Sequence, residues 1–305
     1  MVVANTDMIE IYNQKLSELR QNFFVGSDGA KLANNDLPPL IEKLRTFAMY
    51  GSKPAKSVLG RALHLSSILS CHRMDYGTCL HELKEMIGYA RDLRDGDMEA
   101  AALIRQGLLY AYEFRPCQQH YAFHRAMQLL DKVQSPLIRA CVLFGYAESL
   151  AASGQVELAG VQRHFEAERH FDMAESVSVP DDDPGHAYVH ENSVARTIHR
   201  ARFFVARSRC REAVELLAEM SSRDATPANV EVLSLLAQAH THLVLRQQGE
   251  DSFERACFFI ETLVDTAKRM GSILYHFQAQ IYYELLMLSK YHNNASQCLS
   301  HVVAF

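Results

Sequence analysis

The sequence has no tryptophan and is poor in the residues that interrupt helices. Its 305 residues include only 14 glycines and 8 prolines. Because glycine and proline most often break helices and mark turns, their scarcity favours a mostly helical chain. Hydrophobic residues make up 48% of the chain and charged residues 22%, which is typical of a folded globular protein and not of a disordered one.

The features of secreted, membrane and nucleic-acid-binding proteins are also missing. The 7 cysteines are an odd number, lie far apart and include no C-x-x-C pair, which favours reduced thiols in an intracellular protein. The N-terminus reaches Asp7 before any long apolar run, and no run of about 18 apolar residues occurs. A formal net charge of −5 gives no general attraction to nucleic acid or anionic lipid. We therefore expect a cytoplasmic protein without a membrane or direct nucleic-acid partner.

Apolar residues recur with helical spacing along most of the chain. One helix is expected over residues 5–24 and a second up to Gly51, with Pro38 and Pro39 in the first turn of the second helix, where a missing amide costs no hydrogen bond. Residues 1–54 are interpreted as an N-terminal helical lead or cap, and residues 55–305 as an array of paired helices.

The turns within the first three helix pairs are regularly spaced. Met74, Phe114 and Gly154 follow one another at intervals of 40 residues. A constant period of this size without strand-like alternation is typical of a helical-hairpin solenoid. An insertion near residues 160–186 interrupts the period, and its Pro- and Asp-rich end, Val179–Gly185, predicts an exposed acidic loop.

Further helix pairs are expected after the insertion. They comprise residues 187–206 with 210–221, residues 228–247 with 251–270, and residues 272–290 with a short helix from Ala295 after a turn near His292.

Small and aromatic residues recur in these pairs as they do in the tetratricopeptide repeat. In the second pair, Gly107, Tyr110, Phe123 and Ala126 fit that motif, in which small residues let helices approach and aromatic residues fill the space between them. The period of 40 is longer than the usual value of about 34, and the motif is degenerate. The chain resembles the divergent tetratricopeptide-like arrays in the sensor half of bacterial signal-responsive transcription regulators.

The resemblance implies an all-α fold, a right-handed superhelical solenoid of about five to six helix-turn-helix repeats with an N-terminal helical lead. It also implies a signalling or regulatory role based on protein or peptide binding. The chain contains no recognisable DNA-binding domain, so the role of transcription regulator is not transferred to it.

In such a solenoid the first helix of each pair lines the concave groove. Arginine, histidine and tyrosine interleaved with apolar residues suit a peptide and its carbonyl and carboxylate groups. The predicted groove residues are Arg61, His64, Arg105, Tyr112, Glu148, His199, Arg202, His240, Arg246 and Tyr282. We expect a non-catalytic binding or sensing module that captures a peptide, a protein segment or a small ligand and relays it to a partner. A scaffold that forms homo-oligomers stays open as another interpretation.

The most basic local feature is a run of arginines between Arg196 and Arg211. It is interpreted as a solvated helix face or as a site for an anion or acidic partner. The acidic loop at Asp181–Asp183 could equally neutralise these arginines within the protein.

No motif for catalysis is present: the chain lacks a G-x-S-x-G elbow, a phosphate-binding glycine loop and a G-x-G-x-x-G sequence. Histidines four residues apart could bind zinc beside a carboxylate, but no third ligand is specified. The sets weighed are His120 with His124, His186 with His190 and Glu191, His164 with His170, Glu166 and Glu168, and Cys71-His72 with Cys79 and His81. We favour surface and capping roles for the histidine sets and packing within the hairpin for the Cys71, His72, Cys79 and His81 set, and we predict no metal and no cofactor. The alternative is an enzyme or metalloprotein that uses the mid-chain His/Glu insertion.

Overall fold

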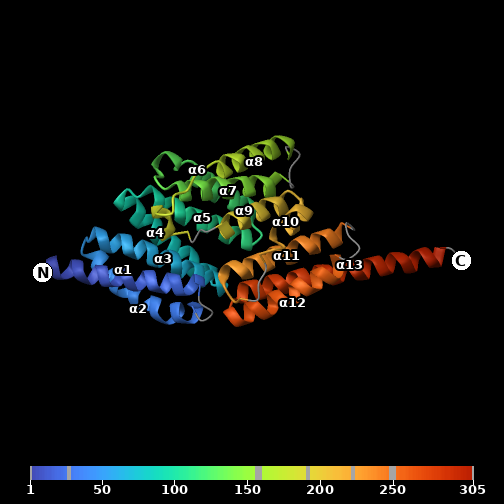
Figure 1. Cartoon of the computed structure of the whole chain (residues 1–305), viewed down its shortest axis with the longest axis horizontal. Helices are drawn as coiled ribbons and strands as arrows, with labels where there is room; N and C mark the ends of the chain where they lie inside the picture. The colour runs from blue at the N-terminus through green and yellow to red at the C-terminus, as the bar shows by residue number, and fades with distance from the viewer. Residues whose placement is uncertain are drawn as a thin grey trace. The chain divides into compact units, whose positions relative to one another are not determined.

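A computed structural model of the chain describes the backbone of residues 2–25, 29–154, 160–189, 193–220, 224–246 and 252–303 (Figure 1). These residues form thirteen α-helices and two 3-10 helices and contain no strand, which confirms the all-α expectation. Over the same residues, no helix combines the length and hydropathy that a membrane span requires.

The helices have the following bounds. The α-helices are α1 (Val2–Val25), α2 (Gly29–Met49), α3 (Lys53–His72), α4 (Tyr76–Leu93), α5 (Gly96–Tyr112), α6 (Pro116–Met127), α7 (Pro136–Gly154), α8 (Gly160–Glu175), α9 (Ser193–Ala206), α10 (Cys210–Leu217), α11 (Pro227–Leu245), α12 (Ser252–Met270) and α13 (Ile273–Val303). The 3-10 helices are η1 (Leu130–Lys132) and η2 (Pro184–Ala187).

The chain divides into two compact units, Met1–His199 (unit 1) and Arg200–Phe305 (unit 2), and the division falls inside α9. The boundary expected after residue 54 lies within unit 1, near the start of α3, and stays a prediction.

Neighbouring helices pack against each other in both units. In unit 1 each helix from α1 to α7 contacts the one that follows it, and the odd-numbered helices α1, α3, α5 and α7 also contact one another in succession, α1 with α3, α3 with α5 and α5 with α7. These four odd-numbered helices, here called the A layer, therefore lie side by side, as Figure 1 shows for α3, α5 and α7. In unit 2, α11 contacts α10, α12 and α13 in the same manner. This is the arrangement of stacked helical hairpins.

The turns within hairpins repeat one backbone geometry. Met74 and Phe114 both adopt left-handed backbone conformations, with φ of 59° and 56°. In both turns the following residue closes the helix end: the amide of Asp75 donates to Ser70 O (2.9 Å), and that of Arg115 to Tyr110 O (2.9 Å). This pattern of a left-handed residue followed by a long-range amide bond is the Schellman C-cap. The equivalence of Met74 and Phe114 is therefore confirmed.

The same geometry recurs at Ser208, where φ is 62° and the amide of Arg209 donates to Phe204 O (2.8 Å). It also occurs between helix pairs, at Arg94 and Gly271, where φ is 56° and 73°. Gly154 is the last residue of α7, and the turn expected after it lies outside the described residues.

Side chains fix where several helices begin. Ser52, Asp75 and Asp95 precede α3, α4 and α5, and each side-chain oxygen accepts a hydrogen bond from a backbone amide three residues later, at 3.3, 3.1 and 2.8 Å. These bonds satisfy amides that have no acceptor within the helix. Hydrogen bonding from Thr78 is the main cause that lowers the pKa of Asp75.

The ring of Phe123 shows why small residues recur in the hairpins. A Cβ atom added to Gly107 would lie 2.5 Å from this ring, and one added to Gly145 would lie 1.9 Å from it. Phe123 of α6 therefore packs closely against both α5 and α7 and is fully buried. The expected pairing of Gly107 with an aromatic residue is confirmed, and Gly145 is a second small residue that the motif comparison did not single out.

The second lead helix begins earlier than expected. α2 starts at Gly29, so Pro38 and Pro39 lie in its interior and not in its first turn. The buried apolar face keeps helical spacing across both prolines and consists of Ala33, Leu37, Leu40, Ile41, Leu44 and Ala48. Because α2 packs on α1 and α3, burial of this face outweighs the roughly 3 kcal/mol that a proline costs inside a helix.

The C-terminal helix is continuous. α13 runs from Ile273 to Val303, so the turn expected near His292 and the separate helix from Ala295 are wrong. This stretch contains no glycine or proline, and nothing in it ends a helix that has already been nucleated.

The acidic loop is only partly exposed. Asp181 and Asp182 are exposed as expected, but Asp183 is 3% exposed. Its carboxylate accepts hydrogen bonds from Ser135 Oγ, from the amide of Leu137 (3.2 Å) and from the amide of Gly185 (2.7 Å). Three donors compensate for burial of the carboxylate. The expectation of a wholly exposed loop is therefore wrong at Asp183, which attaches this segment to the start of α7.

Candidate functional site

The ten predicted groove residues are divided between the two units. Arg61, His64, Arg105, Tyr112, Glu148 and His199 lie in unit 1, and Arg202, His240, Arg246 and Tyr282 lie in unit 2. The first five belong to α3, α5 and α7, which are A-layer helices. Three of them, Arg61, His64 and Arg105, lie near one another in the structure. Most of the others pack against or hydrogen-bond with other residues.

His64 is the centre of the group that the structure brings together. Its side chain is 5% exposed, and burial lowers the pKa of the imidazole well below its usual range. The charges of Arg20 and Arg105 act in the same direction, so both guanidinium groups lie near this neutral ring. The ring of Tyr188 meets His64 edge-on, with centroids 6.0 Å apart.

Arg20 and Arg61 line a pocket of about 350 Å³. The pocket is formed by α1, by Arg61 of α3, and by His186 and Ala187 of η2. Arg20 Nη2 donates to the carbonyl oxygen of His186 (3.0 Å), whereas Nη1 is buried without a hydrogen-bond partner in the described part of the chain. Arg61 has no ion pair or hydrogen bond with any described residue.

The segment from Asp183 to Tyr188 covers this side of the A layer. Gly185 lies so close to α7 that an added Cβ would be 2.3 Å from Ser135 Oγ. Tyr188 is 6% exposed, and burial raises the pKa of its hydroxyl above the usual range. The segment thus touches α7 through Asp183, α3 through Tyr188 and α1 through the carbonyl of His186.

Two other predicted residues of unit 1 have partners of their own. Glu148 Oε1 accepts a hydrogen bond from Gln119 Nε2 (3.1 Å), and the ring of His199 stacks on that of Phe144 at 5.2 Å. Tyr112 is partly buried and is the last residue of α5.

The predicted residues of unit 2 are occupied by packing and pairing. Arg202 forms an ion pair with Glu231, and Arg246 Nη2 donates to Ser208 Oγ (2.6 Å). His240 is 3% exposed and stacks on a phenylalanine ring at 5.3 Å, while Tyr282 belongs to the buried core. None of these four side chains lines a described pocket.

The arginine run from Arg196 to Arg211 does not form one basic patch. Arg196 donates to Val177 O (2.6 Å), Arg202 pairs with Glu231, and Arg209 pairs with Glu212 and lies 4.5 Å from the ring centroid of Phe204. Arg202 and Arg209 are thus paired with carboxylates, and Arg196 donates to a backbone carbonyl.

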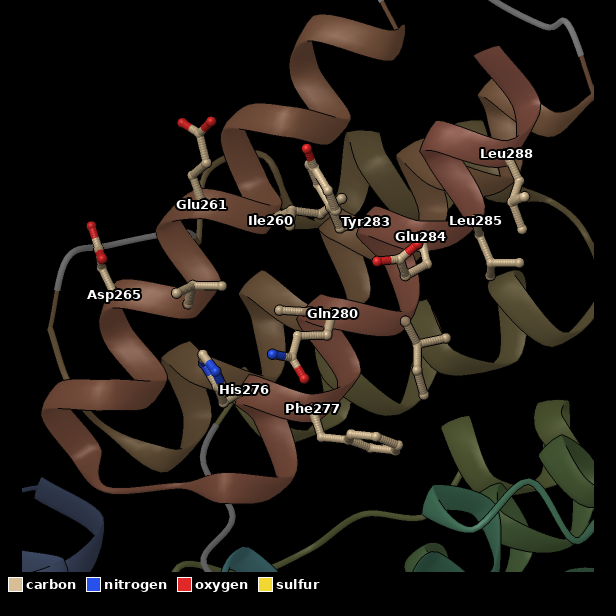
Figure 2. A pocket seen from close by; sticks show the side chains of 13 residues that line it. Ile260, Glu261, Asp265, His276, Phe277, Gln280, Tyr283, Glu284, Leu285 and Leu288 are labelled. Atoms are coloured by element: carbon tan, nitrogen blue, oxygen red, sulfur yellow. The ribbon is translucent and has the colours of Figure 1, made fainter. Parts of the chain in front are cut away.

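A larger groove lies between α12 and α13 in unit 2, with a volume of about 1000 Å³ (Figure 2). Apolar side chains of both helices line it, namely Ile260, Val264, Phe277, Ala279, Ile281, Leu285 and Leu288. Figure 2 shows Glu261 and Asp265 projecting from α12, and Glu284 from α13. No lysine or arginine lines the groove.

One face of α13 remains exposed beside this groove. Phe277, Ile281, Leu285 and Leu288 follow at intervals of four, four and three residues, which places them on one helix face. Phe277, Leu285 and Leu288 are 43%, 36% and 64% exposed. An apolar stripe of this kind is the surface that one helix presents to another.

The residues considered as metal ligands do not converge in the described part of the chain. No group of three or more His, Cys, Asp or Glu suited to a metal ion occurs there. His120 stacks on Tyr146 (5.4 Å), next to His124 and His170. His190 and Glu191 lie outside the described residues.

The cysteine and histidine pair at the first hairpin is buried as expected of core residues. Burial raises the pKa of the Cys71 and Cys79 thiols, that of Cys79 to about 12, and lowers the pKa of His72 to about 3.

Comparison of the chain with protein-family models, curated proteins and solved structures found no match.

Sequence reasoning missed Arg20 because α1 was interpreted as an N-terminal lead and not as part of the array of paired helices. The sequence offered one signal that Arg20 could be partly buried, because it directly follows Leu19, which lies on the buried face of α1. The α12–α13 groove was missed because a turn near His292 was expected to bring back a covering helix.

Proposed function

We propose that this chain is a tetratricopeptide-like helical-repeat module that binds an amphipathic helix of a partner protein in the groove between α12 and α13. The partner helix carries apolar residues at positions i, i+3 or i+4, and i+7 on one face, with lysine or arginine on its flanks. The observation that carries the proposal is the exposed apolar stripe of α13 next to three carboxylates, with no lysine or arginine among the described residues that line the groove.

The packing pattern of unit 2 favours a helix as the occupant. α11 packs against three described helices, α10, α12 and α13, whereas α13 packs extensively against only two described helices, α11 and α12. A partner helix that lies against the stripe of α13 would give α13 a third neighbouring helix, as α11 has. Recognition of an amphipathic helix in an apolar groove is an established mode of protein–protein binding.

The exposed stripe is costly without a partner. Contiguous apolar surface on a protein marks an interaction site more often than isolated exposed side chains do. Burying Phe277, Leu285 and Leu288 removes apolar area from water at about 25 cal/mol per Å². This is the driving force for the proposed complex.

The charges around the groove define the flanks of the partner. Glu261, Asp265 and Glu284 form no ion pair with a described residue. Basic residues on the flanks of the partner helix would pair with them, which favours encounter and orientation more than it adds affinity. An acidic helix of the same shape would be repelled.

The experiment uses synthetic helical peptides and isothermal titration calorimetry. One peptide has a leucine stripe with lysine flanks, a second has the same stripe with glutamate flanks, and a third has the lysine composition with leucines out of helical phase. We expect saturable one-to-one binding of the first peptide and binding of the other two that is weaker by about tenfold or more, a difference of about 1.4 kcal/mol.

Variants of the full chain test the location. Leu288→Asp places a charge in the stripe and should abolish binding of the first peptide, while Phe258→Asp changes a phenylalanine of α12 that is 58% exposed and does not line the groove. Equal affinity of both variants would contradict the assignment. Concentration-dependent dimerisation that Leu288→Asp abolishes would show that a second copy of the chain, and not a partner helix, occupies the groove.

A further inference from the structure

The pocket lined by Arg20 and Arg61 lies in unit 1, whereas the groove proposed to bind a helix lies in unit 2. We propose that this pocket binds a phosphate group, either as inorganic phosphate or as the phosphate ester of a small molecule. The two guanidinium groups would hold its oxygens.

The first argument is that neither arginine has a carboxylate partner within the described part of unit 1, although the charges of Asp95 and Asp97 act on the neighbouring Tyr188. No carboxylate there forms an ion pair with Arg20 or Arg61. Arg45 of the same unit shows the usual arrangement, because its guanidinium donates to Glu85 at 3.0 and 2.7 Å. Burial of a guanidinium group without an anion is unfavourable, and a bound anion would remove the cost.

The second argument is the geometry of Arg20. Its Nη2 group is held by the carbonyl oxygen of His186 (3.0 Å), and its Cζ atom lies 5.6 Å from the ring centroid of Phe24. These contacts fix the guanidinium plane while Nη1 stays buried without a hydrogen-bond partner among the described residues. A donor that is both buried and unused is costly in a folded protein unless a ligand accepts its hydrogen bond.

The electrostatics show that both positive charges act on the same space. Burial is the main cause that lowers the pKa of Arg20 to about 10, and the charge of Arg61 is the next. The two guanidinium groups therefore repel each other across the pocket. An anion between them would relieve this repulsion.

The charge of the ligand follows from the charge of the site. A phosphate monoester carries about −1.5 to −2 at neutral pH, which matches two guanidinium groups, whereas a carboxylate neutralises only one. The planar fork of arginine also matches phosphate oxygens in pairs. A volume of about 350 Å³ accommodates a phosphate group with a small organic substituent.

Phosphate binding is measured on the full chain by calorimetry at constant ionic strength. The probes are inorganic phosphate, glycerol 3-phosphate and acetate. We expect saturation by both phosphates at millimolar concentration or below and no saturation by acetate. Tighter binding of glycerol 3-phosphate identifies an ester as the ligand, and tighter binding of inorganic phosphate identifies the free anion.

Two variants and one control locate the site. Arg61→Ala should weaken phosphate binding by about tenfold or more, and Arg20→Lys should weaken it while keeping the buried charge. Arg125→Ala removes an arginine of α6 that does not line the pocket, and it should change the affinity by less than about twofold. Circular dichroism checks that each variant is folded, and Arg61→Ala carries the conclusion if Arg20→Lys does not fold.

Several results would overturn the proposal. They are the failure of both phosphates to saturate the wild-type chain, affinity of Arg61→Ala for phosphate equal to that of the wild type, and acetate binding as tight as phosphate binding.

Discussion

In unit 1 a segment of the same chain packs over the polar residues of the A layer, whereas in unit 2 an apolar helix face is exposed to solvent. In unit 1 the segment around Asp183 and Tyr188 lies over the A layer and closes a small pocket that holds two arginines. In unit 2 the groove between α12 and α13 is about 1000 Å³, is apolar on its floor and has acidic side chains at its edges. Both surfaces are built from the same kind of helix pair.

The difference shows how similar packing of helices can present two kinds of surface. An A-layer helix that is covered by a further segment can bury charged groups, because that segment supplies hydrogen-bond acceptors such as the carbonyl of His186. A helix without such a cover exposes the apolar residues that would otherwise form the next part of the core. The chemistry of each surface is thus set by what packs on the helices and not by the helices alone.

The largest expected effect concerns the close packing inside unit 1. Gly145→Ala would push a methyl group into the ring of Phe123, which lies 1.9 Å from the added Cβ. We expect the free energy of unfolding to fall by about 3 kcal/mol, at the upper end of the usual cost of overpacking. Urea denaturation followed by circular dichroism measures it.

Gly88→Ala is the matched control, since nothing lies within 4 Å of its added Cβ. Alanine is the better helix former by about 0.5–1 kcal/mol, so this variant should be stabilised. Equal destabilisation of both variants would mean that helix propensity, and not the contact with Phe123, decides the outcome.

The next effect tests the segment that covers the A layer. Asp183→Ala removes the acceptor for Ser135 Oγ and for the amide of Leu137 in a buried environment. We expect a loss of about 2 kcal/mol in the free energy of unfolding, because buried donors without acceptors are costly. Asp182→Ala changes an exposed neighbour and should be neutral within about 0.5 kcal/mol. If both variants behave alike, the segment is not held by Asp183.

A pH titration compares the buried histidines with exposed ones. Burial lowers the pKa of His240 to about 4, so below its ordinary pKa of about 6.5 the unfolded chain binds a proton that the folded chain does not. Stability from this group is therefore present above about pH 6.5 and is lost as the pH drops toward 4, by about 2 kcal/mol at pH 5.

His240→Phe should remove this part of the pH dependence, and His81→Phe, at an exposed position, should leave it unchanged. Thermal unfolding at several pH values between about 5 and 7.5 gives the answer. A pH profile of His240→Phe parallel to that of the wild type would show that other groups cause the acid instability.

The smallest expected effect concerns the open surface of unit 2. Leu288→Asp should change the free energy of unfolding by less than about 0.5 kcal/mol, because Leu288 is 64% exposed. Leu286→Ala, two residues away on the buried side of α13, should cost about 2–5 kcal/mol. A large loss in the free energy of unfolding for Leu288→Asp in the isolated chain would mean that Leu288 is buried and the groove is already filled. Unit 2 would then not differ from unit 1 in leaving an apolar surface exposed.

Much of the hairpin pattern could be predicted from local sequence. The turns at Met74 and Phe114 were recognisable because helix ends, capping residues and apolar spacing are short-range features. The contact of Gly107 with Phe123 followed from residue size alone, since only a small residue allows that approach. Gly145 of α7 contacts the other side of the same Phe123 ring. This contact was identified only from the packing of α5, α6 and α7 in the structure.

Predictions that required knowledge of neighbouring helices were less successful. Pro38 and Pro39 were placed in a first turn by their local preference, but burial of the α2 face on α1 and α3 overrides it. Predicted groove residues such as His240 and Tyr282 proved to be buried, because helical phase alone does not tell a groove from a core. Arg61 and His64 lie near one another by helical spacing alone, being three residues apart on α3, and their assignment to a groove stays a prediction.

The sequence by itself determined that this protein is helical and where most helices begin and end, because those properties depend on residues within a turn or two of each other. Only the tertiary structure decided that Arg20 lies beside Arg61, that Asp183 is buried at α7, and that the stripe of α13 stays exposed. These features arise from contacts between segments far apart in the chain, whose free energies depend on burial and pairing that no local pattern records.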